Sequence, residues 1–152
     1  MEIREYQTSD LDAIARVYRD AATNTGSQVY SSTQVEVWAA FADRLKQKLD
    51  GGWTIVSVEN GEVVAFGQLD PVDRISLLYT TSQYGRKGYA TQIYRRLEGR
   101  AIASGATHLR TEASRIAKHF FLKMGFEIVE TEYVDRDGVE FERFKMRKAI
   151  AV

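Results

Sequence analysis

A glycine-rich stretch with two adjacent basic residues is the part of the chain best suited to hold a phosphate group. It reads Gly85-Arg86-Lys87-Gly88-Tyr89-Ala90 and stands between a predicted strand and a predicted helix. The first amides of a helix lack internal acceptors and carry partial positive charge, so a helix that starts here can bind an anion. The glycines permit a tight turn and close approach of a ligand. A solvated connector with two exposed basic residues fits the same composition.

Known phosphate-binding motifs do not match this stretch. A Walker A loop needs Gly-Lys-Ser/Thr, and a dinucleotide fingerprint needs three glycines, of which only two are present. A phosphate site for some other nucleotide is therefore the weaker alternative.

Two further residues have side chains that could act on a proton. Glu112 lies one residue before the end of a predicted strand in which Leu109, Thr111 and Ala113 share the opposite side. A carboxylate there can take a proton from an attacking amine, directly or through water, although a solvated or salt-bridged glutamate fits the pattern too. Tyr79, on a neighbouring strand, could orient water or substrate, but a strand tyrosine more often serves packing.

Composition excludes several classes of site. The 152 residues contain no cysteine, which excludes disulfides, thiolate metal sites and a cysteine nucleophile. His108 and His119 have no carboxylate at ligand spacing, so we predict no metal site. Lysine plus arginine equal aspartate plus glutamate at 21 each, so no global field favours nucleic acid or an anionic membrane. Without an apolar run of about 18 residues or a signal-peptide pattern, the protein is expected to be cytoplasmic.

Hydrophobic periodicity predicts one domain of alternating strands and helices. Strands are expected at 2–7, 53–59, 62–69, 75–80, 107–113, 126–134 and 139–146, with helices starting near Ser9 and Thr33 and covering 88–103 and 114–124. Ser9 with Asp12, and Thr33 with Glu36, have capping-box spacing. Residues 24–32 form a polar loop, and Asn60-Gly61 and Asp137-Gly138 are hairpin turns.

The segment 75–113 is a strand-helix-strand crossover, which requires two parallel strands and a right-handed connection. The other neighbouring strands are joined as hairpins. The predicted fold class is therefore α/β of the α+β type. It has a mixed, mostly antiparallel sheet of about seven strands, one parallel crossover and helices on both faces.

Residues 75–126 resemble motifs A and B of the GNAT superfamily of N-acetyltransferases. The family's Gln/Arg-x-x-Gly-x-Gly/Ala loop aligns with residues 85–90, and Ala117-Lys118-His119-Phe120-Phe121-Leu122-Lys123-Met124-Gly125-Phe126 is similar to its helix ending in Gly-Phe. The element order agrees over essentially the whole chain. Glu112-Ala113-Ser114 and the Gly138-Val139-Glu140 hairpin suggest a poorly characterised bacterial branch. The resemblance implies a single GNAT-like domain over residues 1–152.

What the resemblance implies is an acetyl-CoA-dependent N-acetyltransferase that lets an amine attack the thioester directly, without an acyl-enzyme or a metal. The acceptor would be a small amine or an exposed amino group, bound near the N-terminal helices that carry Tyr18, Tyr30 and Trp38. A splay between Tyr79 and Glu112 would admit the acyl end. The enzyme would be a monomer or a homodimer. Cofactor contacts are implied for Leu78, Tyr79, Thr80, Gly85, Arg86, Lys87, Gly88, Tyr89, Ala90, Thr91, Ser114 and Phe121.

Three positions depart from the family pattern. Gly85 stands where the loop usually opens with glutamine or arginine, and Ser114 where many relatives carry asparagine. Phe121 stands where the family often has a tyrosine that protonates the leaving thiolate, and phenylalanine has no proton to give. A non-catalytic acyl-CoA-binding or sensing module is therefore the alternative function.

Overall fold

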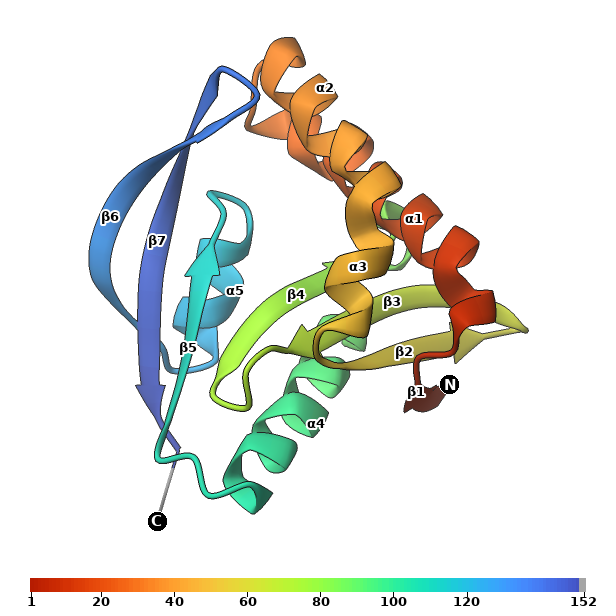
Figure 1. Ribbon diagram of the computed structural model, residues 1–152, viewed down its shortest axis with the longest axis vertical. Coiled ribbons are helices and arrows are strands. Elements are labelled where there is room, and N and C mark those ends of the chain that lie inside the picture. Colours follow the sequence, from red (N-terminus) through yellow and green to blue (C-terminus); the bar gives the residue numbers. More distant parts are fainter. Residues whose placement is uncertain (151–152) are drawn as a thin grey trace.

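A seven-stranded sheet runs through the computed structural model, which describes residues 1–150 (Figure 1). Its strands lie in the order β1-β2-β3-β4-β5-β7-β6. Only β4 and β5 are parallel, and every other neighbouring pair is antiparallel. The predicted mixed, mostly antiparallel sheet with one parallel crossover is confirmed. The strands are β1 (Glu2–Glu5), β2 (Trp53–Glu59), β3 (Glu62–Leu69), β4 (Arg74–Thr80), β5 (His108–Ala113), β6 (Glu127–Arg136) and β7 (Val139–Ala149).

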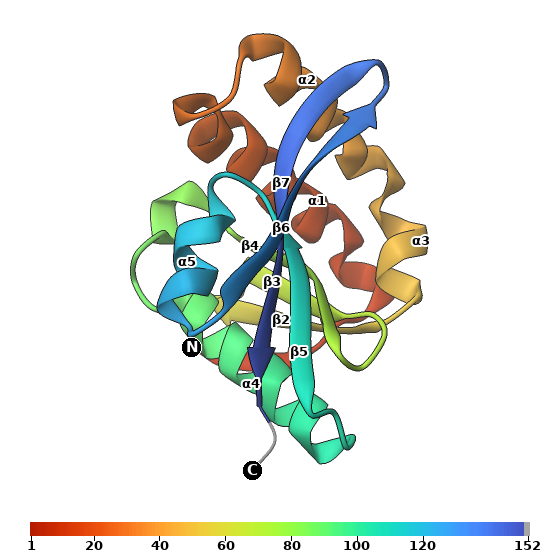
Figure 2. The same ribbon diagram turned by 90° about the vertical axis from the view of Figure 1, so that its left-hand side faces the viewer.

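Helices cover both faces of the sheet, as predicted (Figures 1 and 2). One face carries α1 (Leu11–Asp20), α2 (Ser32–Ala40) and α3 (Leu45–Asp50), and the other carries α4 (Tyr89–Ala103) and α5 (Ala117–Lys123). Two hydrophobic clusters result, because alternate strand residues point to opposite faces. On β3, Ala65 belongs to the cluster under α4 and Phe66 to the cluster under α1.

Helix α4, which begins at the glycine-rich loop, packs very closely on β3. A Cβ atom at Gly67 would lie 2.6 Å from Ile93 Cγ2 and 3.0 Å from Leu97 Cδ1, so only glycine allows this approach. Ile93 and Leu97 are fully buried. This packing fixes the start of α4 relative to the end of β4.

Both predicted capping boxes are wrong in position. Asp10, not Asp12, accepts the backbone N–H of Gln7 at 2.8 Å, and a 3-10 turn at Thr8–Asp10 precedes α1. For α2, the reciprocal pair is Ser31 with Gln34. Ser31 with Gln34 and Thr33 with Glu36 have the same three-residue spacing, so the capping-box pattern alone does not show at which of them α2 begins.

The predicted single helix from Thr33 is interrupted. A 3-10 helix at Phe41–Arg44 separates α2 from α3. Helix α2 has no fully buried residue, whereas Ala42, Leu45 and Leu49 are buried in the cluster under α1. The polar loop predicted at 24–32 overlaps the end of a π-helical turn at Ala21–Thr25, contains a 3-10 turn at Gly26–Gln28 and ends where α2 begins at Ser32.

The two predicted hairpin turns are confirmed. Asn60-Gly61 and Asp137-Gly138 all have positive φ, from 51° to 81°, as a type I′ turn requires.

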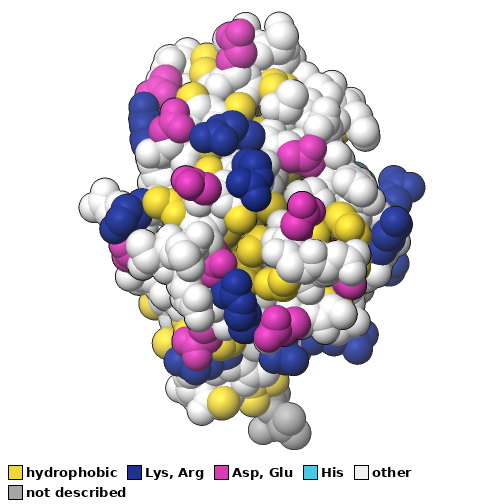
Figure 3. Space-filling model, turned by 90° about the vertical axis from the view of Figure 1, so that its right-hand side faces the viewer, with side chains coloured by type: hydrophobic (Ala, Val, Ile, Leu, Met, Phe, Trp, Pro, Cys, Tyr) yellow, Lys and Arg dark blue, Asp and Glu magenta, His cyan; other side chains and the backbone are white. Residues whose placement is uncertain are grey.

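On the face drawn in Figure 3, basic and acidic side chains are interspersed. None of the helices within residues 1–150 is sufficiently long and apolar to cross a membrane.

Candidate functional site

The parallel strands β4 and β5 are paired only at one end. Their ladder joins Arg74 to Arg110 and Ile75 to Thr111, and the Thr111 hydroxyl donates to the Ile75 carbonyl at 2.8 Å. Beyond these pairs the strands diverge (Figure 1). Backbone groups on the facing edges of the diverging segments therefore have no partner strand and can meet a ligand.

A β-bulge in β4 coincides with this divergence. Gln68 pairs with Leu77 and Leu69 pairs with Ile75, which leaves Ser76 as the extra residue. The bulge turns the strand, so that Ile75 packs under α4 while Leu77 packs under α1. Ser76 Oγ donates to Gln68 Oε1 at 2.6 Å. Nothing in the local sequence marks this bulge.

A cavity of about 390 Å³ opens between the diverging strands. Its walls come from the N-terminal helical region, from β4 and β5, from α5 and from the β6–β7 hairpin. Both proposed catalytic residues, Tyr79 and Glu112, line it, together with Leu78, Ser114 and Phe121. Residues 85–91 do not line it and form a separate feature at the far end of β4.

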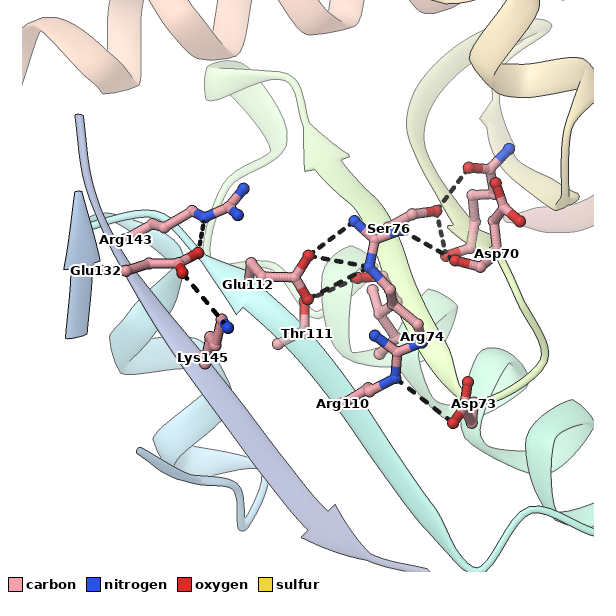
Figure 4. A network of polar contacts seen from close by, with 12 residues as sticks. Asp70, Asp73, Arg74, Ser76, Arg110, Thr111, Glu112, Glu132, Arg143 and Lys145 are labelled. Atoms are coloured by element: carbon pink, nitrogen blue, oxygen red, sulfur yellow. Dashed lines mark hydrogen bonds and ion pairs between the residues drawn. The ribbon is translucent and has the colours of Figure 1, made fainter. Parts of the chain in front are cut away.

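Glu112 is held by Arg74, an arginine that no motif in the sequence indicates. Arg74 donates from Nη2 to Oε1 at 2.8 Å and from Nε to Oε1 at 3.0 Å, and its Nη1 donates to the Asp70 carbonyl at 3.0 Å (Figure 4). Glu112 Oε2 has only a 3.3 Å contact with Arg74 Nε. Since a carboxylate oxygen has two lone pairs, Oε2 can still accept a hydrogen bond from another donor. The Glu112 side chain is 17% exposed.

Tyr79 belongs to an aromatic group on the side of α1. Its ring centroid lies 4.9 Å from that of Tyr18 and 6.3 Å from that of Trp38. Burial raises the pKa of Tyr79 to about 12, and burial raises the pKa of Tyr18 as well. Both hydroxyls are therefore protonated near neutral pH and can donate a hydrogen bond.

Phe121 faces the cavity from α5. It is 2% exposed and packs edge-on against Phe126, with ring centroids 5.1 Å apart. Ser114 Oγ accepts the Ala117 N–H at 3.1 Å, and α5 begins at Ala117, three residues later than predicted. The Tyr30 hydroxyl accepts the Arg115 N–H at 2.9 Å and so links the N-terminal region to the turn before α5.

The glycine-rich loop has the properties of an anion site. Helix α4 begins at Tyr89, no side chain caps its first turn, and that turn contains no acidic residue. Gly88 has φ +87° and Arg86 has φ +62°, whereas Gly85 has φ −64°, which any residue adopts. Among residues 1–150, Arg86 and Lys87 have no ion-pair partner, and both are exposed. The left-handed turn thus falls on Arg86 and Gly88.

Unsatisfied polar groups stand where β4 leads into this loop. The hydroxyl oxygens of Thr80 and Thr81 are buried without a hydrogen-bond partner in the described part of the chain. Such groups are costly unless a ligand or water bonds them. A ligand with polar groups along an extended arm and phosphates at one end would satisfy both Thr80 and the start of α4. Acetyl-CoA has this chemistry, so the residues fit it.

The loop is also tied to the N-terminal region. Asp20, at the end of α1, accepts hydrogen bonds from the Ser82 backbone N–H at 2.5 Å and from Ser82 Oγ at 3.2 Å. No signal in the sequence connects Asp20 with Ser82, because the two residues are 62 positions apart. The bond fixes the approach of the chain to Gly85.

Comparison with known proteins gives a consistent result. A family model described as an acetyltransferase (GNAT) domain matches residues 26–149. The uncharacterised N-acetyltransferase YafP of Escherichia coli K12 is 31% identical over 149 residues, covering 97% of this chain and 95% of that protein. The crystal structure of a GCN5-related N-acetyltransferase from Rhodopseudomonas palustris has a TM-score of 0.94 at 28% identity and covers 97% of this chain and 94% of that one.

The fold is also shared with a more distant N-acetyltransferase. The PaiA N-acetyltransferase of Thermoplasma acidophilum, solved in complex with coenzyme A, has a TM-score of 0.73 at 21% identity. The match covers 97% of this chain and 98% of that chain.

Proposed function

Since the chain belongs to the GNAT family of N-acetyltransferases, we propose that it transfers an acetyl group from acetyl-CoA directly to an amine, without an acyl-enzyme. The acceptor is a small amine or an exposed amino group. The observation that supports this most is the arrangement around β4. The uncapped start of α4 lies at one end of the strand, and Glu112 lies in the cavity beside its other end.

The cosubstrate would lie along the outer end of β4. Backbone groups of Leu78, Tyr79 and Thr80 would receive the pantetheine arm, and the N–H groups from Arg86 to Thr91 would hold the pyrophosphate. Since backbone amides supply most of this contact, the loss of a glutamine or arginine at Gly85 weakens binding only modestly. Acetyl-CoA bound in this way would supply an activated thioester at the cavity.

Glu112 would remove the proton from the attacking amine. A bond forms between the amine nitrogen and the acyl carbon, and the carbon–sulfur bond then breaks. Glu112 Oε2, which keeps a free lone pair, can accept the amine proton directly or through one water. Arg74 fixes the orientation of this carboxylate.

The leaving thiolate does not depend on a tyrosine at Phe121. A free thiol has a pKa of about 8.5, so a thiolate leaves readily near neutral pH and takes a proton from water. Phe121 then serves as an apolar wall beside the thioester. Tyr79, whose pKa of about 12 keeps it protonated, would orient the substrate or a water. Because the chain belongs to a family of N-acetyltransferases, a phenylalanine at position 121 is not a sufficient reason to prefer a non-catalytic acyl-CoA-binding module.

Direct transfer is tested by mass spectrometry of the protein and of the acceptor. We expect incubation with acetyl-CoA and a panel of amines to acetylate at least one amine, with one free thiol released for each acetyl group transferred. Protein quenched during turnover should carry no acetyl group. An acetylated protein that passes its label to the amine would contradict direct transfer.

A further inference from the structure

The cavity contains two positively charged side chains that no acidic group of the described chain neutralises. Five cationic residues line it, namely Arg44, Lys48, Arg74, Arg136 and Arg143. Three of them have acidic partners: Arg74 pairs with Glu112, Arg143 with Glu132, and Arg44 with Asp137 at 3.7 Å. Within residues 1–150, Lys48 and Arg136 form no ion pair.

The unpaired cations come from elements far apart in the sequence and line the same cavity. Lys48 belongs to α3 and Arg136 to the end of β6. The Arg136 guanidinium lies 6.0 Å from the centroid of the Phe41 ring, and the Arg44 guanidinium lies 5.1 Å from it. The fold therefore places Arg136 beside Arg44 at the Phe41 ring, which also lines the cavity.

The pKa of Lys48 is lowered by its surroundings in the cavity. Although the residue is exposed, desolvation by the surrounding atoms lowers its pKa, and the positive charges of Arg74 and Arg136 lower it further. The carboxylates of Glu112 and Asp70 act in the opposite direction and more weakly. An anion placed between Lys48 and Arg136 would relieve the repulsion between them.

The remaining lining residues indicate what such a ligand carries besides its negative charge. Tyr18, Tyr30, Trp38, Phe41, Tyr79 and Phe141 give the cavity aromatic walls. Glu112 offers one free carboxylate position, which suits an ammonium group before it loses its proton.

We infer that the acceptor is an amine that also bears an anionic group, a carboxylate or a phosphate, which Lys48 and Arg136 bind while the amine faces Glu112. This inference rests on the proposed acetyl transfer and narrows its substrate class. Amines with several positive charges are disfavoured, because Lys48 and Arg136 would repel them.

Matched pairs of acceptors test the inference. Phenylalanine is compared with phenylalaninamide, and phosphoethanolamine with ethanolamine, by kcat/KM for acetyl transfer. We expect the anionic member of at least one pair to be preferred about tenfold or more, a factor that a charge-assisted hydrogen bond supports. The pair that shows the preference tells whether the anion is a carboxylate or a phosphate.

Variants connect the preference to the two residues. Lys48→Met and Arg136→Met should each reduce the ratio of anionic to neutral kcat/KM by about tenfold. Lys46→Met is the control on the same helix, since Lys46 does not line the cavity and pairs with Asp50. This control should keep the wild-type ratio. Equal use of both members of each pair, or a preference for the neutral member, would overturn the inference and leave acetyl transfer intact.

A binding measurement covers the case in which neither pair is turned over. Calorimetry of the CoA-loaded protein compares N-acetylphenylalanine with its amide, and inorganic phosphate with chloride. The anionic probe should bind in at least one comparison, and Lys48→Met should weaken it about tenfold. The inference is overturned if none of the probes binds. It is also overturned if N-acetylphenylalanine and its amide bind equally well and phosphate does not bind. Failure of CoA itself to bind would instead contradict the proposed function.

Discussion

Replacing Gly88 with valine is expected to weaken acetyl-CoA binding by at least about a hundredfold while the chain stays folded. Gly88 precedes α4 with φ +87°, a conformation that a β-branched residue rarely adopts and that costs about 1–3 kcal/mol. The new side chain would also stand over the open helix start. Loss of two charge-assisted hydrogen bonds to phosphate, at about 1.5–3 kcal/mol each, corresponds to at least a hundredfold change in affinity.

The fold should survive because a Cβ atom at Gly88 would meet no other atom within 4 Å. Gly99→Val is the matched control on the same helix, where a Cβ is equally unobstructed and φ is not positive. Calorimetry with acetyl-CoA and circular dichroism should show a loss of affinity only in Gly88→Val. Retained affinity in folded Gly88→Val would mean that the phosphates bind elsewhere.

Glu112→Gln is expected to lower kcat by about a hundredfold or more and to leave acetyl-CoA affinity nearly unchanged. General base catalysis contributes about 10² to 10⁴ in rate, and glutamine keeps the shape of the side chain without accepting a proton. The loss should shrink as pH rises, because more of the acceptor amine is then already deprotonated. The measurement is the pH dependence of kcat for both proteins.

Asp73→Asn provides a control from the same network (Figure 4). Asp73 pairs with Arg110 at 3.5 Å, outside the cavity, and both side chains are about half exposed. Its replacement should leave kcat and its pH dependence as in the wild type. If Glu112→Gln behaves like Asp73→Asn, Glu112 has a structural role only.

Local patterns in the sequence account for most of the sheet. Asn60-Gly61 and Asp137-Gly138 specify turns whose geometry depends on the turn residues themselves, and the strands on either side of each turn are apolar or alternating segments of the sequence. The bulge at Ser76 was not predictable, since it arises from unequal pairing between β3 and β4. The break between α2 and α3 was missed because apolar spacing continued across Phe41–Arg44.

The candidate site likewise has one part that the sequence predicts and other parts that it does not. The loop from Gly85 to Ala90 was predictable because a glycine-rich turn and the following helix form one continuous segment. The Arg74–Glu112 pair joins residues 38 positions apart, and Lys48 and Arg136, which line the same cavity, are 88 positions apart. A single sequence does not show that such residues share a site. Nor could the orphaned hydroxyl of Thr80 be foreseen, since its environment depends on the packing around the end of β4.

A thermal melt of the protein with acetyl-CoA, ATP or NAD tests the proposed acetyl-CoA site most directly. A ligand at 100 times its dissociation constant adds about 2.7 kcal/mol of stability, and about 1 kcal/mol shifts the melting temperature of a domain of this size by about 2–4 °C. We therefore expect acetyl-CoA to raise the melting temperature by roughly 5–10 °C, while ATP and NAD leave it unchanged. No shift with millimolar acetyl-CoA, or an equal shift with ATP, would contradict an acetyl-CoA site at the start of α4.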